Sequence, residues 1–304
     1  MHKSVLLQEC IENLNLKNDS VVVDCTLGYG GHSSEILSRI PNGFLYAFDQ
    51  DKEAIKYSND RLSKIRNNFE IINTNFENIE KELAKRTDQV DGILYDLGVS
   101  SPQLDVDERG FSFHNDARLD MRMDINNPIS AYEVINNYSY EDLTNILYKY
   151  GEEKYASSIV KGIIKERQLK PIETTLELTE IIKNNVPEKY RREKHPARKT
   201  FQAIRIEVNR ELDVFESSLK QALNLIKVGG RICVITFHSL EDKICKDIFK
   251  SVSTLDHNLK NLPIIPEELQ PKYKIIGSIK PSKEELDYNN RARSAKLRVI
   301  ERVR

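Results

Sequence analysis

The feature that most constrains the fold of this chain is a short β-branched run that passes directly into a glycine-rich turn. Residues 21–24 (VVVD) precede a turn with glycines at positions 28, 30 and 31, and a helical pattern begins at Ser33. Glycine allows a sharp turn and lets a ligand approach the backbone closely. A strand, a glycine turn and a helix in this order predict a nucleoside-binding site on a parallel α/β sheet.

A second apolar run, residues 44–48, extends this pattern. It ends in Asp49, twenty-one positions after Gly28. An acidic side chain at that distance is placed to accept hydrogen bonds from the ribose hydroxyls of a nucleoside. We therefore predict that Asp49 binds ribose. A helix N-cap is the other interpretation of Asp49, although Asp51 could fill that role instead.

The glycine loop favours S-adenosylmethionine over NAD as the nucleoside cofactor. The dinucleotide fingerprint G-x-G-x-x-G starts at Gly28 and Gly30, but Ser33 stands where its third glycine belongs. The loop also lacks a basic residue that could meet a pyrophosphate. Asp24 and Thr26 instead place a carboxylate and a hydroxyl at the strand end, which suit a cationic, amine-bearing ligand.

Composition excludes several classes of protein. Charged residues make up 31% and hydrophobic residues 39%, as in ordinary globular proteins, and no apolar run approaches the roughly 20 residues that span a bilayer. The four cysteines show no C-x-x-C spacing, so we expect neither disulfides nor a metal site. These observations predict a cytoplasmic protein without a membrane segment.

Strand and helix patterns alternate at both ends of the chain. The sequence predicts strands at 69–73 and 90–95 and helices at 33–40, 52–65 and 79–85. Between 105 and 213 only helical patterns occur, at 140–150, 154–166, 175–185 and 200–216. A helix at 215–226 and strands at 228–237, 272–276 and 296–303 follow. We predict an α/β fold with a doubly wound parallel sheet, formed by residues 1–104 and 214–304 and interrupted by a helical insertion, 105–213.

Several polar and aromatic residues fall where the predicted strands end. Asp24, Asp49 and Asp96 close three of these strands, and Phe76 follows a fourth. Because ligands of such sheets lie beyond the carboxyl ends of the strands, these four residues are expected to border one pocket. Phe76 either stacks on an adenine or packs under the sheet.

Basic residues are concentrated in two parts of the sequence. Between Lys189 and Arg205, seven Lys or Arg residues stand against a single acid, Glu193, and the aromatic residues Tyr190 and Phe201 lie among them. Residues 291–304 hold a second cluster. Phosphate contacts and base stacking in RNA recognition use such clusters. A solvated helix face is the alternative interpretation.

Longer strings carry a family resemblance. They are SVLL at 4–7, DLGVSSPQLD at 96–105, RGFSF at 109–113, LDMRMD at 119–124, HPARKTFQAIRIEVNREL at 195–212, FHSLED at 237–242 and RARSAKLR at 291–298. With the glycine loop, these strings closely resemble the bacterial ribosomal RNA small-subunit methyltransferase H family, of the MraW type. The resemblance runs in order over nearly the whole chain.

The resemblance implies a class I, Rossmann-like methyltransferase. It implies that S-adenosylmethionine donates a methyl group to the exocyclic N4 of one cytosine in 16S ribosomal RNA, near the decoding centre. The substrate is then 16S ribosomal RNA or the small ribosomal subunit, and a homodimer is left open. By motif matching, the cofactor contacts fall on Gly30, Gly31, His32, Asp49, Phe76, Asp96 and Gln103.

The chemistry of the acceptor suggests further roles. Cytosine N4 is a poor nucleophile because its lone pair is delocalised into the ring, so an acceptor for the amine hydrogens would orient it. Asp96 is our candidate for this catalytic role. His32 could also donate to the cofactor or lie at the surface. His238 is a candidate substrate contact, and Arg198, Lys199 and Arg205 are candidate phosphate contacts.

Other functions fit parts of the sequence. The cofactor half cannot by itself identify the acceptor, so a methyltransferase acting on DNA or protein is the nearest alternative. A nicotinamide-dependent oxidoreductase is disfavoured by Ser33. A non-catalytic protein that senses a nucleoside cofactor and binds RNA is the third alternative function.

Overall fold

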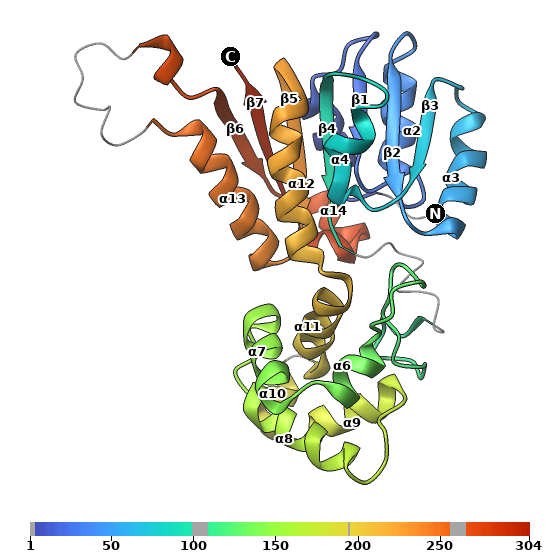
Figure 1. Ribbon diagram of the computed structural model, residues 1–304, viewed down its shortest axis with the longest axis vertical. Helices are drawn as coiled ribbons and strands as arrows, with labels where there is room; N and C mark the ends of the chain where they lie inside the picture. The colour runs from blue at the N-terminus through green and yellow to red at the C-terminus, as the bar shows by residue number, and fades with distance from the viewer. Residues whose placement is uncertain (1–3, 99–108, 194, 256–265) are drawn as a thin grey trace. The chain divides into compact units, whose positions relative to one another are not determined.

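The computed structural model describes residues 4–98, 109–193, 195–255 and 266–304. The chain divides into two compact units, one formed by Met1–Gly98 with Leu212–Arg304 and the other by Val99–Glu211 (Figure 1). The sequence-based division fell at 104/105 and 213/214, and the first of these boundaries lies outside the described residues. No helix in the described part of the chain is long and apolar enough to cross a membrane.

The first unit is built on a seven-stranded sheet in the order β3-β2-β1-β4-β5-β7-β6. Its strands are β1 (Val21–Asp24), β2 (Phe44–Asp49), β3 (Phe69–Asn73), β4 (Val90–Asp96), β5 (Ile226–Thr236), β6 (Tyr273–Ile279) and β7 (Lys296–Arg302). All seven correspond to strands predicted from the sequence. The predicted parallel arrangement holds for β1 to β5, whereas β7 pairs antiparallel with both β5 and β6.

Helices cover both faces of this sheet because side chains of successive strand residues point to opposite faces. On β1, Val22 packs into a cluster with α1 (Leu7–Leu14) and α2 (Gly31–Arg39). Its neighbour Val23 packs into the cluster of the other face, which includes residues of α4 (Ile79–Leu83), α12 (Glu211–Leu225) and α13 (Ser239–Ser253). The remaining helices of this unit are α3 (Lys52–Ser63) and α14 (Lys283–Tyr288), with short 3₁₀ turns at Phe76–Asn78, Glu267–Leu269 and Asn290–Ser294.

The regular secondary structure in the described residues of the second unit is helical and starts at Ala131, apart from one isolated β-bridge between Arg118 and Thr174. Its helices are α6 (Ala131–Asn137), α7 (Tyr140–Gly151), α8 (Ala156–Arg167), α9 (Thr175–Asn184), α10 (Glu188–Glu193) and α11 (Ala197–Asn209). They enclose an apolar core of their own. The predicted α/β class with an inserted helical segment is therefore confirmed.

One predicted helix was wrong. The pattern at 200–216 predicted a single helix, but the structure has a break at Arg210, which adopts the left-handed conformation with φ 50° and caps α11. The α12 helix then starts at Glu211. A non-glycine residue seldom adopts this conformation, so the sequence carried no sign of the break.

Two cations of the basic cluster at 291–304 serve the fold. Lys296 and Arg298 lie on β7, and both donate to the carboxylate of Asp242 on α13, at 2.7 Å from Lys296 Nζ and from Arg298 Nε. Burial alone would raise the pKa of Asp242, but the hydrogen bonds from Arg298 and Lys296 lower it to about 2. These cations are therefore already neutralised within the protein.

We predict that Asp242→Asn lowers the free energy of unfolding by about 2 kcal/mol at pH 7. The pKa of this carboxyl is lower in the folded than in the unfolded chain. Its contribution is therefore present above pH ~4 and is lost as the pH falls towards 2. Urea unfolding at several pH values tests this. Asp247→Asn, at an exposed position on the same helix, is the control, and an equal loss at pH 2 and pH 7 would contradict the prediction.

Candidate active site at the carboxyl edge of the sheet

Three carboxylates stand at one edge of the sheet. Asp24, Asp49 and Asp96 are the last residues of β1, β2 and β4, and these strands are neighbours in the sheet. Because the strands are parallel, their carboxyl ends meet at the same edge. Among the described residues, no Lys or Arg side chain forms a hydrogen bond or ion pair with any of the three.

Asp24 organises the turn beneath the site. Its side chain is 1% exposed, and its oxygens accept hydrogen bonds from the Thr26 amide at 3.0 Å and from Ser33 Oγ at 2.7 Å. Burial raises its pKa, and these hydrogen bonds act against the rise. Thr26 Oγ1 in turn accepts the Asp96 amide at 2.7 Å. The serine at the third fingerprint position thus bonds to Asp24, where a glycine could not.

The glycine loop is held tightly by its own chain. Gly28 (φ 49°) donates its amide to Asp49 Oδ2 at 2.8 Å, and its carbonyl accepts Ser58 Oγ at 2.7 Å. Gly30 has φ 71°, a conformation that other residues rarely adopt, and it precedes the first residue of α2. A Cβ atom on Gly31 would lie 1.9 Å from Ser4 Oγ. Both predicted loop contacts, Gly30 and Gly31, therefore lie where the backbone packs closely.

Asp49 is half-buried, and both oxygens of its carboxylate accept hydrogen bonds from backbone amides. Oδ2 accepts from Gly28 and Oδ1 accepts from Asp51 at 2.8 Å. Burial raises its pKa to about 6. Asp51, and not Asp49, is the N-cap of α3. Since each carboxylate oxygen has two lone pairs, Asp49 retains acceptor capacity for a ribose hydroxyl.

Asp96 has the most unusual environment of the three. Its Oδ1 is buried and has no hydrogen-bond partner among the described residues, while Oδ2 lies 3.4 Å from His32 Nδ1. Burial, followed by the negative charges of Asp24 and Glu241, raises its pKa to about 8. A buried acceptor without a partner is costly. Such a group in a site calls for a ligand that donates to it or neutralises it.

His32 is the buried neighbour of Asp96. Its side chain is 5% exposed, so the surface position that we considered is wrong. Nε2 lies 3.1 Å from the Val5 carbonyl oxygen, and burial lowers its pKa to about 4. The ring is therefore neutral at pH 7, with Nε2–H donating to Val5 and Nδ1 facing Asp96. Because both ring nitrogens already face protein atoms, His32 would contact a ligand through its backbone amide, which lies in the first turn of α2.

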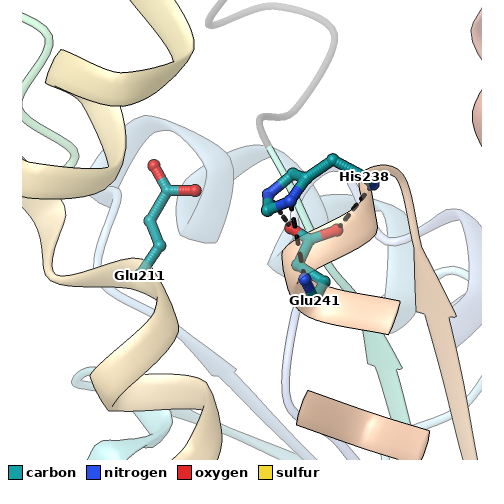
Figure 2. A group of neighbouring side chains, drawn as sticks. All are labelled: Glu211, His238 and Glu241. Carbon is teal, nitrogen blue, oxygen red and sulfur yellow. Dashed lines mark hydrogen bonds and ion pairs between the residues drawn. The ribbon is translucent and has the colours of Figure 1, made fainter. Parts of the chain in front are cut away.

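His238 is the N-cap of α13, and Glu241 lies in the first turn of this helix. The two residues form a capping box, in which Glu241 Oε2 accepts the His238 amide at 3.2 Å (Figure 2). The same oxygen accepts the Phe237 amide at 2.7 Å. His238 Nε2 lies 3.0 Å from Glu241 Oε1, and the two side chains are 11% and 4% exposed. The predicted substrate contact at His238 is thus largely covered and engaged in helix capping.

Sequence reasoning missed Glu241, whose charge contributes to the raised pKa of Asp96. The signal was available: a polar residue followed three positions later by Glu, just after a buried strand, is the sequence pattern of a capping box. His238 is an unusual residue in the capping position, which obscured the pattern.

Phe76 packs partly into the core and stays partly exposed. It lies in a 3₁₀ turn after β3 and contacts Tyr95 edge-to-face, with ring centroids 5.7 Å apart and an interplanar angle of 82°. It packs against the core below the sheet but is only partly buried. One part of the ring therefore supports the core while the rest stays accessible to a ligand. Gln103 lies outside the described residues.

The three candidate phosphate contacts differ in their surroundings. Arg198 is exposed on α11. Lys199 Nζ donates to the Glu152 carbonyl at 2.6 Å. Arg205 is 16% exposed and makes two hydrogen bonds to Glu211, at 2.8 and 2.9 Å. Arg198 is therefore the member of this set whose side chain is best placed to meet an RNA phosphate.

The aromatic residues of this basic cluster are used by the fold. Phe201 is 3% exposed and belongs to the core of the helical unit. Tyr190 donates its hydroxyl to Glu153 at 2.7 Å. Phe201 is therefore not available to stack on a base, whereas Tyr190 is partly exposed and is held by its hydroxyl to a buried carboxylate.

The sheet order, with an antiparallel β7 between β5 and β6, and the acidic carboxyl edge define a Rossmann-like protein of the methyltransferase class. The model of the MraW methylase family matches residues 1–303. The chain belongs to this family, as the resemblance predicted, and this membership excludes the oxidoreductase alternative.

Relatives from two bacteria align with almost the entire chain. "Ribosomal RNA small subunit methyltransferase H" of Exiguobacterium sibiricum is 52% identical over 307 residues, covering 100% of this chain and 98% of that protein. The protein of the same name from Finegoldia magna is 51% identical, covering 99% and 98%. A crystal structure of an rRNA methylase from Streptococcus thermophilus aligns with this chain at 13% sequence identity and a TM-score of 0.45.

The Asp24 network generates a stability prediction. Ser33→Ala removes the hydroxyl that donates to a buried carboxylate, so we expect a loss of about 1–3 kcal/mol in the free energy of unfolding. Ser38→Ala, at an exposed position of the same helix, should change it by less than about 0.5 kcal/mol. Urea denaturation measures both. Equal effects of the two substitutions would show that Ser33 does not stabilise the turn.

Proposed function

We propose that this protein is an S-adenosylmethionine-dependent methyltransferase that acts on 16S ribosomal RNA, at the exocyclic N4 of one cytosine near the decoding centre. Its full-length relatives at 51–52% identity are named as methyltransferases of small-subunit ribosomal RNA. The choice of cytosine N4 and of the 16S molecule or small subunit as partner comes from the sequence resemblance. The proposed cytoplasmic location comes from composition and cysteine usage, and a homodimer is left open.

The chemistry of the carboxyl edge supports the cofactor. S-adenosylmethionine, when bound, supplies a methyl group activated by a positively charged sulfur. Asp24, Asp49 and Asp96 form an acidic edge without a bonded Lys or Arg among the described residues. Such an edge suits a cationic ligand better than a pyrophosphate. Asp49 would accept from the ribose hydroxyls, Gly30 and Gly31 would allow close approach, and Phe76 would contact the adenine.

The observation that carries the reaction is the unpartnered Oδ1 of Asp96. An exocyclic amine has two hydrogens to donate, and a carboxylate oxygen accepting one of them fixes the orientation of the nitrogen. It also favours the positive charge that develops on this nitrogen as its lone pair is used. The other oxygen, Oδ2, lies 3.4 Å from His32 Nδ1. While Asp96 is protonated, Oδ2–H donates to this unprotonated nitrogen, which sets the orientation of the carboxyl group before the ligands arrive.

The helical unit supports RNA recognition. We propose that residues 105–213 bind the substrate, with Arg198 as a phosphate contact and Lys199 and Arg205 as neighbouring positive charges. An exposed arginine on a helix rich in cations suits the phosphate backbone. His238 is proposed to position α13 and Glu241 rather than to touch the substrate.

Mass mapping of the modified nucleosides tests the reaction. Small-subunit RNA from cells without this protein should lack one N4-methylated cytosine, and purified protein with S-adenosylmethionine should restore it. A modified nucleoside profile unchanged by the deletion would refute the proposal. Methyl transfer to DNA or protein but not to this RNA would refute its substrate.

Asp96→Asn is predicted to reduce turnover and raise stability together. We expect kcat to fall about 10²-fold because the carboxylate is lost while side-chain size is kept. The pKa of Asp96 is higher in the folded than in the unfolded chain, so ionisation opposes folding increasingly as the pH rises from about 4 to 8. The asparagine variant should therefore be more stable by at least about 1 kcal/mol at pH 8, but not at pH 4.

Single-turnover rates and urea unfolding at both pH values measure these effects. Asp88→Asn, at an exposed position before the same strand, is the control. If Asp96→Asn retained full turnover, the catalytic role would be lost. If it gave no gain in stability at pH 8, the assignment of a strained buried carboxylate would be wrong.

A further inference from the structure

Two of the strings singled out in the sequence meet inside the helical unit. Phe113 ends the RGFSF string, and His195 begins the HPARKTF string. Their rings are stacked, with centroids 4.3 Å apart and an interplanar angle of 19°. The site described at the carboxyl edge of the sheet uses neither residue.

The stacked pair has a buried side and an accessible side. Phe201, which is 3% exposed, contacts Phe113 edge-to-face at 5.6 Å and belongs to the core of the unit. His114 is exposed and lies 4.5 Å from the Phe113 ring and 5.3 Å from the His195 ring, between centroids. Phe113 and His195 are each only half-buried. The pair therefore forms an aromatic surface at the boundary between core and solvent.

His195 carries an unsatisfied polar atom. Its Nδ1 is buried and has no hydrogen-bond partner among the described residues. Burial, followed by electrostatic interactions with His114 and Lys183, lowers its pKa. If His195 only packed against Phe113, an apolar side chain would serve as well. A packing role therefore does not explain why a buried nitrogen without a hydrogen-bond partner stands here.

A cation lies one helical turn further along. Arg198 is exposed in the first turn of α11, and its amide donates to the carbonyl of His195, just before the helix, at 3.2 Å. Lys199, the next residue, donates to the Glu152 carbonyl. The surroundings of Phe113 and His195 thus combine aromatic rings, a polar ring atom and a positive charge, which are the groups that bind a single-stranded nucleotide.

We infer that Phe113, His195 and Arg198 form a nucleotide-binding subsite for the RNA substrate, in which an unstacked nucleobase lies on the aromatic pair and its phosphate meets Arg198. This inference rests on the proposed function, because the nucleotide belongs to the strand that is methylated. Stacking is tolerant of base identity, so the aromatic pair would hold a base without reading its edge.

Fluorescent RNA tests this subsite directly. The probe is a fragment of small-subunit RNA around the methylated cytosine, labelled in separate arms with pyrrolocytosine at the target or 2-aminopurine at each neighbouring position. Binding to the wild-type protein should quench one of these labels, since stacking on an aromatic ring quenches both. Phe113→Leu should abolish that quench and weaken RNA binding by about 5- to 100-fold.

Control variants separate stacking from folding. Tyr148→Leu replaces an aromatic residue of the same unit that is 48% exposed, and should leave quench and affinity unchanged. Affinity for S-adenosylmethionine should be the same in all variants. Should Phe113→Leu fail to fold, His114→Ala, at an exposed position, tests the same surface through a reduced quench.

Salt dependence tests the phosphate contact. Arg198→Gln should lower the slope of log affinity against log salt concentration by about 0.7, the value for one contact to a single strand. Lys161→Gln, at an exposed position on α8, should leave the slope unchanged. If wild-type protein methylates the RNA but both the quench and the slope are unaffected by these substitutions, the subsite is refuted and the proposed function stands. If wild-type protein neither binds nor methylates the RNA, the proposed function itself fails.

Discussion

The site depends on a buried carboxylate, Asp24, that ties together three segments distant in the sequence. Its oxygens hold the Thr26 amide at the end of β1 and the Ser33 hydroxyl in the first turn of α2. Through Thr26 Oγ1 the same network fixes the backbone of Asp96 at the end of β4. A carboxylate buried in this way is favourable only when its lone pairs are used. The geometry of the glycine loop and the position of Asp96 therefore follow from one interaction.

The buried carboxyl groups of the acidic edge lower the stability of the folded protein, and we infer that they are kept because ligand binding needs them. Asp49 and Asp96 both have raised pKa values, at about 6 and about 8, mainly because they are buried. Among the described residues no Lys or Arg neutralises them, although ion pairs elsewhere in the chain are common, as at Asp242. The absence of an internal cation leaves the edge suited to a cation that arrives with a ligand. Natural sites often retain such unfavourable groups because function requires them.

Much of the fold could be predicted because it rests on local patterns. Short apolar runs, most of them with β-branched residues, marked all seven strands, and the carboxyl ends of β1, β2 and β4 could be located from their aspartates. What could not be predicted depends on contacts between distant segments. The antiparallel β7, the left-handed Arg210 and the pairing of His32 with Asp96 have no local signal. Lys296 and Arg298 had the composition of an RNA-binding cluster, and only the fold brings Asp242 to them.

In the proposed function, buried carboxylates at this edge are neutralised by the positive charge of the cofactor. Calorimetric titration at pH 7 in two buffers with different ionisation enthalpies measures how many protons are released on binding. S-adenosylmethionine should release close to one proton, because the bound cation lowers the pKa of Asp96 below 7, and S-adenosylhomocysteine, which has no sulfonium charge, should release clearly fewer. Identical proton release by the two ligands, or none by either, would contradict it.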